Sequence, residues 1–318
     1  MRFNVIYDIV GNNPVLAGKS AKEWTEDRLS ALENGEEFTL VLNRFAPLLN
    51  ANLVEKTAKM LVKSGSQKAV FPSGYLARTK GKGELRINTL PFVGLTTINV
   101  GLIQKKLYRE IAVSFVKNGV NILDVDSVYI DSTVRLEKNS AIYPFNVLEG
   151  YSVVHENTVL LWGNVISNSV IGANCKVSAS YIYDSTVGDN CTVGPFARLR
   201  QNARIDNDVR IGDFVEIKNS SLENGVKAAH LAYIGDATVG ENTNVGCGTV
   251  FANFDGKVKH NTEVGKNVFI GCNSNLIAPL TIGDNSFIAG GSTITENIAE
   301  NTFAISRVKQ VTKKNKRG

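Results

Sequence analysis

The sequence predicts a mainly β protein, in which a small α/β piece and a linker helix precede a left-handed parallel β-helix. The first observation is a repeat, because from about residue 126 an aliphatic side chain recurs every six positions, as at Ile130, Leu136, Ile142, Leu148, Val154, Leu160 and Ile166. The second is that Gly, Asp or Asn often follows the aliphatic residue, as in "VIGANC", "TVGDNC" and "TIGDNS". The third is the N-terminal third, which lacks this period.

A period of six fits neither the 3.6-residue turn of a helix nor the alternation of a simple strand. It fits a hexapeptide repeat, in which six residues form a short strand and a turn, with the aliphatic side chain pointing inward. Three such sides close a triangular coil of about 18 residues. Gly, Asn and Asp suit the corners because they tolerate positive φ.

The repeat is interrupted conspicuously between Phe251 and Val264, where the segment "ANFDGKVKHNTE" intervenes. Insertions loop out of one face of a solenoid and often carry its binding site. A tolerated surface insertion is the alternative interpretation.

The N-terminal third contains two amphipathic segments with helical periodicity, over 19–35 and 50–65, and strand-like runs at 38–43 and 68–73. A longer helical segment extends from about residue 96 to Gly119. We therefore predict an α/β domain over residues 1–97, a linker helix over 98–125, the β-helix over 126–306 and a basic tail over 307–318.

Composition excludes several classes of protein. Most of the net charge of +5 comes from Lys313, Lys314, Lys316 and Arg317 at the end of the chain, and no stacking aromatic side chains accompany them, so we expect no nucleic-acid partner. No apolar run is long enough for a membrane helix, the N-terminus does not resemble a signal peptide, and we expect a cytoplasmic protein. The four cysteines are far apart and form no CxxC pair, which argues against structural zinc.

Residues 194–307 resemble the acetyltransferase half of the bacterial bifunctional N-acetylglucosamine-1-phosphate uridyltransferase/glucosamine-1-phosphate N-acetyltransferase family. The resemblance is carried by "GPFARLR", "GDFVEIK", "KAAHLAYIGDA", "NVGCGT", "NFDGKVKH" and "AISRVKQ", which occur in the family's order. It implies acetyl transfer from acetyl-CoA, as cosubstrate, to glucosamine 1-phosphate on the route to UDP-N-acetylglucosamine and peptidoglycan. It also implies a homotrimer.

The resemblance implies a role for each matching residue. His230 is the expected general base. The expected substrate-binding residues are Arg200, Glu216, Lys218, Tyr233, Asn244, Asn253 and Lys259. The expected contacts with acetyl-CoA are Cys247, Asn253, Phe254, Cys272, Gly290 and Arg307. At Cys247, Phe254, Cys272 and Gly290 this chain departs from the family's familiar residues.

The N-terminal third departs further from the family. Its glycine-rich and basic triphosphate loop is absent, and "NRFAPLLNANLVEK" carries Phe45 at the family's metal-binding aspartate position and Arg44 at the preceding glycine. A phenyl ring cannot ligate Mg²⁺, which prefers oxygen donors. Asn99 alone remains of a second metal-contacting stretch. We expect a shortened, degenerate nucleotidyltransferase-like domain with no metal site and no uridyltransferase activity.

The residue types suit the chemistry that the resemblance implies. A neutral amine must attack the thioester, and His is the side chain that accepts a proton near neutral pH. Arg and Lys side chains suit a dianionic phosphate, and Arg200 and Lys218 are 18 residues apart, so the repeat alone stacks them on one side. Two alternatives remain open, a hexapeptide acyltransferase with another amino sugar or acyl donor, and a non-catalytic trimeric scaffold.

Overall fold

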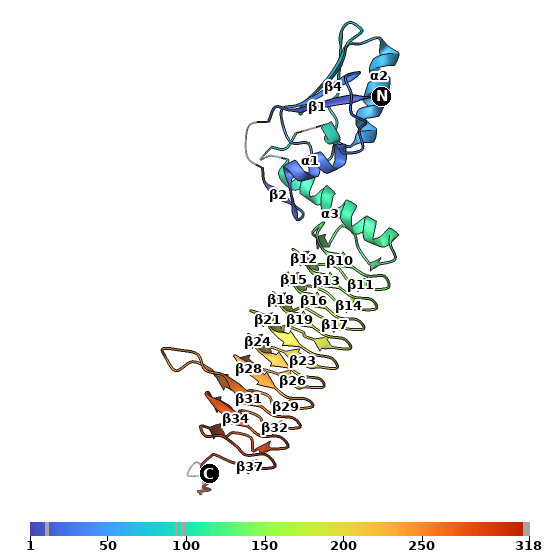
Figure 1. Ribbon diagram of the computed structural model, residues 1–318. Helices are drawn as coiled ribbons and strands as arrows, with labels where there is room; N and C mark the ends of the chain where they lie inside the picture. Colours follow the sequence, from blue (N-terminus) through green and yellow to red (C-terminus); the bar gives the residue numbers. More distant parts are fainter. Residues whose placement is uncertain (10–12, 93, 97–98, 314–318) are drawn as a thin grey trace. The chain divides into compact units, whose positions relative to one another are not determined.

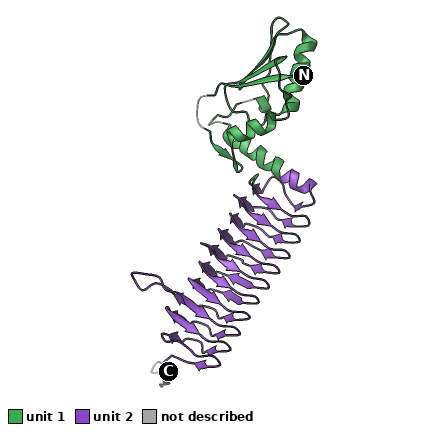
Figure 2. Cartoon of the chain, viewed as in Figure 1, with its two compact units in different colours: residues 1–111, 131–133 green, residues 112–130, 134–318 purple. Residues whose placement is uncertain are grey.

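A computed structural model describes residues 1–9, 13–92, 94–96 and 99–313 of the chain. It divides into two compact units, residues 1–111 with 131–133 and residues 112–130 with 134–318 (Figure 2). Residue 98 of the expected linker helix and Lys314, Lys316 and Arg317 of the basic tail lie outside the described residues.

The first unit contains a five-stranded mixed sheet in the order β1-β4-β6-β5-β7. Its strands are β1 (Phe3–Tyr7), β4 (Phe38–Leu42), β5 (Lys68–Phe71), β6 (Gly74–Arg78) and β7 (Glu84–Arg86). A small hairpin, β2 (Val15–Leu16) with β3 (Lys19–Ser20), and a 3₁₀ turn, η1 (Leu90–Phe92), complete it. The strands predicted at 38–43 and 68–73 are confirmed.

The three predicted helices are also confirmed. Helix α1 (Ala21–Leu29) is shorter than expected and begins with a capping box, in which Ser20 and Glu23 bond to each other's backbone N–H. Helix α2 (Ala51–Ser64) begins at the cap Asn50 and ends at Gly65, whose φ of 70° is the left-handed conformation that glycine adopts readily. Helix α3 (Val100–Lys117) precedes the solenoid.

The second unit is the predicted left-handed parallel β-helix, with sheets of nine, eleven and ten strands that form its three sides (Figure 1). The nine-stranded sheet contains β10 (Arg135–Leu136), β13 (Val153–Val154), β16 (Val170–Ile171), β19 (Thr186–Val187), β22 (Arg204–Ile205), β25 (Ser221–Leu222), β28 (Ala237–Val239), β31 (Thr262–Val264) and β34 (Leu280–Ile282). The eleven-stranded sheet contains β8 (Asn121–Ile122), β11 (Ala141–Ile142), β14 (Val159–Leu160), β17 (Lys176–Val177), β20 (Thr192–Val193), β23 (Arg210–Asp213), β26 (Lys227–His230), β29 (Asn244–Val245), β32 (Phe269–Ile270), β35 (Phe287–Ile288) and β37 (Phe303–Ala304). The ten-stranded sheet contains β9 (Tyr129–Ile130), β12 (Val147–Glu149), β15 (Val165–Ser167), β18 (Tyr181–Tyr183), β21 (Arg198–Arg200), β24 (Glu216–Lys218), β27 (Tyr233–Gly235), β30 (Val250–Ala252), β33 (Asn275–Ile277) and β36 (Thr293–Ile294).

The sequence pattern explains this architecture. The aliphatic residues of the repeat point inward and are almost fully buried, as Ile166, Leu199 and Ile234 illustrate. Corner residues such as Asn174 and Asn190 have φ values of 56° and 58°, which Asn tolerates better than most side chains. Because every strand pairs in register with the strand one coil away, outward side chains form columns along the solenoid.

The interruption of the repeat lies between β30 and β31. Its residues leave the coil as a loop that projects from the solenoid (Figure 1), and an isolated antiparallel bridge joins Phe254 to Lys259 within it. The loop does not disturb the register of the solenoid, because β31, the first strand after it, pairs with β28 of the preceding coil.

Candidate functional site

Two cations of the expected phosphate site are stacked on the ten-stranded sheet. Arg200 ends β21, Lys218 ends β24, and the two residues are register partners. The next partner of Lys218 along this column is Gly235, the last residue of β27. The stacking of Arg200 on Lys218 that the repeat predicts is thus confirmed.

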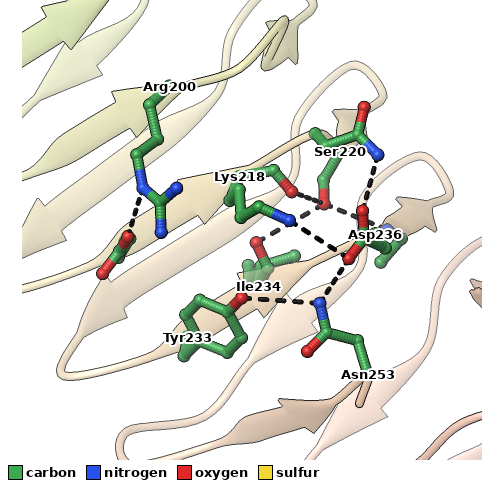
Figure 3. A network of polar contacts seen from close by, with 10 residues as sticks. Arg200, Lys218, Ser220, Tyr233, Ile234, Asp236 and Asn253 are labelled. Atoms are coloured by element: carbon green, nitrogen blue, oxygen red, sulfur yellow. Dashed lines mark hydrogen bonds and ion pairs between the residues drawn. The ribbon is translucent and has the colours of Figure 1, made fainter. Parts of the chain in front are cut away.

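Lys218 belongs to a buried polar network centred on Asp236 (Figure 3). Its Nζ lies 3.3 Å from Asp236 Oδ2, and only 6% of either residue is exposed. The other Asp236 oxygen accepts a 2.6 Å hydrogen bond from Asn219 Nδ2, and Asn253 Nδ2 donates to Oδ2. Asp236 and Asn219 were not among the residues predicted from the sequence, although Asp236 lies inside the motif "KAAHLAYIGDA".

These contacts set the charges of the network. Burial raises the pKa of the Asp236 carboxyl, but hydrogen bonds from Asn219, Asn253 and Lys218 outweigh it and hold that pKa below its usual value. The amine of Lys259 is the largest influence that raises the pKa of Lys218, and Asp236 adds to it. The ammonium of Lys218 in turn lowers the pKa of Lys259. The network thus holds the Lys218 ammonium and the Lys259 amine close to one carboxylate, and lysine side chains are suited to binding an anion.

Glu216 and Tyr233 form a second column at the beginning of the same strands, since they are register partners in β24 and β27. Glu216 Oε1 accepts a 2.6 Å hydrogen bond from Arg200 Nε. The Tyr233 hydroxyl lies 3.4 Å from Asn253 Nδ2. A Cβ at Gly235 would lie 2.5 Å from that hydroxyl, so glycine makes room for the tyrosine ring.

The projecting loop is closed by a hydrogen-bonded turn around Asp255. Its Oδ1 accepts hydrogen bonds from the backbone N–H groups of Lys257 and Val258, and its Oδ2 lies 2.8 Å from His260 Nε2. The pKa of Asp255 is lowered to about 2, mainly by His260 and then by these two N–H groups. The turn positions Lys259, which the sequence analysis expected at the phosphate.

His230 lies on the adjoining side of the solenoid, as the last residue of β26 in the eleven-stranded sheet. Its Nδ1 lies 2.6 Å from Oδ1 of Asp213, its register partner in β23. This hydrogen bond is the main reason that the pKa of Asp213 is lowered. His230 thus has an ionised carboxylate at one ring nitrogen, and its side chain is 54% exposed.

Three residues expected at acetyl-CoA follow His230 on successive coils. Strands β26, β29, β32 and β35 pair in register, one coil after another. In this register Cys247, Cys272 and Gly290, each just after its strand, occupy the position equivalent to His230 in β26. Cys272 is exposed and Cys247 partly so. Arg307 Nη1 donates a 2.8 Å hydrogen bond to the Gly290 carbonyl, which joins Arg307, a further expected residue, to this column.

The remaining expected residues lie on neighbouring elements. Asn244 begins β29, where it pairs with Lys227 and Phe269 on the same sheet as His230. Phe254 is 58% exposed on the projecting loop, next to the buried Asn253.

The positions compared with the nucleotidyltransferase domain lie in the first unit. Phe45 is partly buried, and its carbonyl accepts a hydrogen bond from Leu95 N. Asn99 uses its side chain locally, donating to the Gly94 carbonyl and accepting from Thr96 N. Within the described ranges, no three His, Cys, Asp or Glu residues lie together as metal ligands. Over the same ranges no helix is both long and apolar enough to cross a membrane.

The chain is similar to several known proteins. The bacterial transferase hexapeptide family (six repeats) matches residues 184–219 and 261–296. The bifunctional protein GlmU of Clostridium acetobutylicum is 47% identical over 229 residues, which are 71% of this chain and 50% of that protein. GlmU of Clostridioides difficile is 37% identical over 315 residues, 95% of this chain and 68% of that protein. A UDP-N-acetylglucosamine acyltransferase structure from Campylobacter jejuni aligns with a TM-score of 0.35 and 17% identity, over 56% of this chain and 71% of that one.

The fold and the repeats define a hexapeptide-repeat protein built as a parallel β-helix. Within that class, the chain belongs to the family of the bifunctional protein GlmU. It spans about half the length of the first curated relatives that it matches.

Proposed function

We propose that the protein transfers an acetyl group from acetyl-CoA to the 2-amino group of glucosamine 1-phosphate. The observation that carries this proposal is the polar network at Lys218, in which Asp236 and Asn253 hold the ammonium beside the Lys259 amine, one coil from Arg200. Such a cluster is suited to a sugar phosphate, because Arg and Lys bind phosphate oxygens by charge-assisted hydrogen bonds. Glu216, Tyr233 and Asn244 are the expected contacts with the sugar.

In the proposed reaction the amine nitrogen attacks the thioester carbonyl carbon. A C–N bond forms, the C–S bond breaks, and coenzyme A leaves as the thiolate, which takes up the proton that His230 has removed from the amine, so that coenzyme A is released as the thiol and the base is regenerated. His230 accepts the proton that the amine loses, through the ring nitrogen that does not face Asp213. A base of this kind contributes on the order of 10²–10⁴-fold to the rate.

Acetyl-CoA is the proposed donor, and its binding residues are Cys247, Asn253, Phe254, Cys272, Gly290 and Arg307. His230, Cys247 and Cys272 share one column, which supports this assignment. The residues proposed to contact acetyl-CoA and the proposed base then lie along one edge of the sheet. We assign the transfer chemistry to residues 126–306 and infer a homotrimer. The sugar phosphate would be a precursor of UDP-N-acetylglucosamine.

We further infer that the chain lacks uridyltransferase activity and its Mg²⁺ site. Phe45 offers no oxygen ligand from its side chain. Asn99, the other position compared with the family, already bonds to Gly94 and Thr96. Residues 1–97 then serve a purpose other than nucleotidyl transfer.

Release of coenzyme A tests the proposal. Purified protein should release free thiol from acetyl-CoA with glucosamine 1-phosphate and not with glucosamine 6-phosphate, because the phosphate cluster fixes where the anion lies relative to the amine. If the protein turns over only another amino sugar or a longer acyl-CoA, the proposed substrates are wrong and the protein is an acyltransferase with a different acceptor or donor. No turnover with any acyl donor would favour the non-catalytic scaffold.

A further inference from the structure

Asp213 and His230 are joined by the register of the solenoid as well as by their side chains. They end paired parallel strands as direct partners, and Leu231 N donates a 2.9 Å hydrogen bond to the Asp213 carbonyl. The 2.6 Å contact between Asp213 Oδ1 and His230 Nδ1 therefore connects two rigid backbones. The two side chains are 38% and 54% exposed, and a pair so open to water contributes little to folding.

This contact fixes the tautomer of the ring. An ionised carboxylate only accepts hydrogen bonds, so Nδ1 must carry the proton. In the neutral ring the lone pair then lies on Nε2, which is the nitrogen available to a substrate. When Nε2 takes up a proton, the adjacent carboxylate stabilises the imidazolium, as in other histidine bases paired with a carboxylate.

Asp213 is the charged group that contacts Nδ1 of His230. The titratable and charged groups on the neighbouring elements are Asp213 and Arg210 one coil before, Cys247 one coil after, Lys227 in the same strand, and Glu216 and Tyr233 at the beginning of the adjoining strands; Arg210 begins its strand and pairs with Lys227, whereas Asp213 pairs with His230. Glu216 is engaged by Arg200.

We propose that Asp213 is the positioning residue of His230, which holds the ring in the Nδ1–H tautomer so that Nε2 is the nitrogen that accepts the proton. This inference rests on the proposed function for its kinetic consequence. The Asp–His contact itself is independent of the substrate, so its structural part can be tested without turnover.

Asp213→Asn is the main variant, because it keeps the shape of the side chain and removes the charge. We expect kcat to fall on the order of 10- to 100-fold, by analogy with the loss of a carboxylate that orients a metal-binding histidine. KM for both substrates should stay within about twofold, since nothing that binds them is removed. Asp213→Glu should recover part of the rate, and Asp206→Asn, an exposed carboxylate elsewhere on the solenoid, should behave as wild type.

Selective ¹⁵N labelling of histidine in the full chain gives the readout that does not need activity. The chain has three histidines, and His155 and His260 have their own carboxylate partners, Glu137 and Asp255. In Asp213→Asn, only the His230 ring should change its tautomer signal. An unchanged His230 ring, or a wild-type kcat in Asp213→Asn, would overturn the inference. If the wild-type protein shows no acetyl transfer but Asp213→Asn still changes the tautomer signal of His230, only the proposed function is contradicted.

Discussion

Lys218 Nζ lies 3.3 Å from Asp236 Oδ2 across two successive coils, with both side chains almost buried. Removing one partner of a buried ion pair leaves an uncompensated buried charge, which destabilises the fold. Replacing both partners by apolar residues leaves no buried charge. This pair holds Asn219 and Asn253 in place as well, so it links the stability of the solenoid to the order of the phosphate cluster.

Asp236→Leu should therefore lower the free energy of unfolding by about 3 kcal/mol. The reason is that Lys218 would keep its charge in a buried site and face the Lys259 amine without a counterion. Urea denaturation at neutral pH measures the change. The double variant Lys218→Met/Asp236→Leu is the control and should recover most of the loss; equal destabilisation of the single and double variants would show that the ion pair is not the cause.

The turn of the projecting loop should be sensitive to acid. The pKa of Asp255 is lowered to about 2 in the folded protein, against about 3.9 for an unperturbed aspartate. A lowered folded pKa contributes stability that is complete above about pH 4 and is lost as the pH falls through about 2. Asp255→Asn should thus be less stable than wild type at pH 6, and the difference should shrink at pH 3. Urea unfolding at both values checks this, and a difference that grows in acid has the wrong sign.

Arg200→Gln should weaken the sugar-phosphate complex selectively. Loss of a charge-assisted hydrogen bond raises KM for glucosamine 1-phosphate on the order of 10- to 100-fold. KM for acetyl-CoA should not change, because Arg200 lies on the sheet that holds Glu216 and Lys218. Arg198→Gln, at the other end of the same strand, is the matched control. A rise in both KM values for Arg200→Gln would argue against a dedicated phosphate contact.

Gly235→Ala should disturb the site more than the fold. The added Cβ would lie 2.5 Å from the Tyr233 hydroxyl and 2.7 Å from Asn253 Nδ2, both ends of side chains that can move. We expect a raised KM for the sugar phosphate with little change in melting temperature. Gly101→Ala, with no heavy atom within 4 Å of the new Cβ, serves as the control: its KM should not change, and its melting temperature should stay the same or rise slightly, because alanine favours a helix more than glycine does. If the variant loses stability but keeps its KM, glycine at position 235 is required by the fold and not by the binding site.

Much of this molecule could be predicted from its sequence, because the hexapeptide period is a local rule repeated along the chain. The period gave the inward residues, the corners, the projecting loop and the stacking of Arg200 on Lys218. The strands and helices of the first unit followed from strand-like runs, helical periodicity and caps such as Asn50 and Gly65.

The supporting residues could not be predicted in the same way. Asp213 and Asp236 act through contacts to residues one coil away, and a lone aspartate at a solenoid corner is usually a turn residue. Only the three-dimensional register reveals that one faces His230 and the other faces Lys218.

Acetyl transfer by His230→Ala is the measurement that tests the central claim most directly. Wild-type protein should acetylate glucosamine 1-phosphate from acetyl-CoA, and the variant should lose about 10²–10⁴-fold in kcat with its fold intact. A variant that keeps the wild-type kcat, or a wild-type protein that leaves glucosamine 1-phosphate unacetylated, would contradict the account.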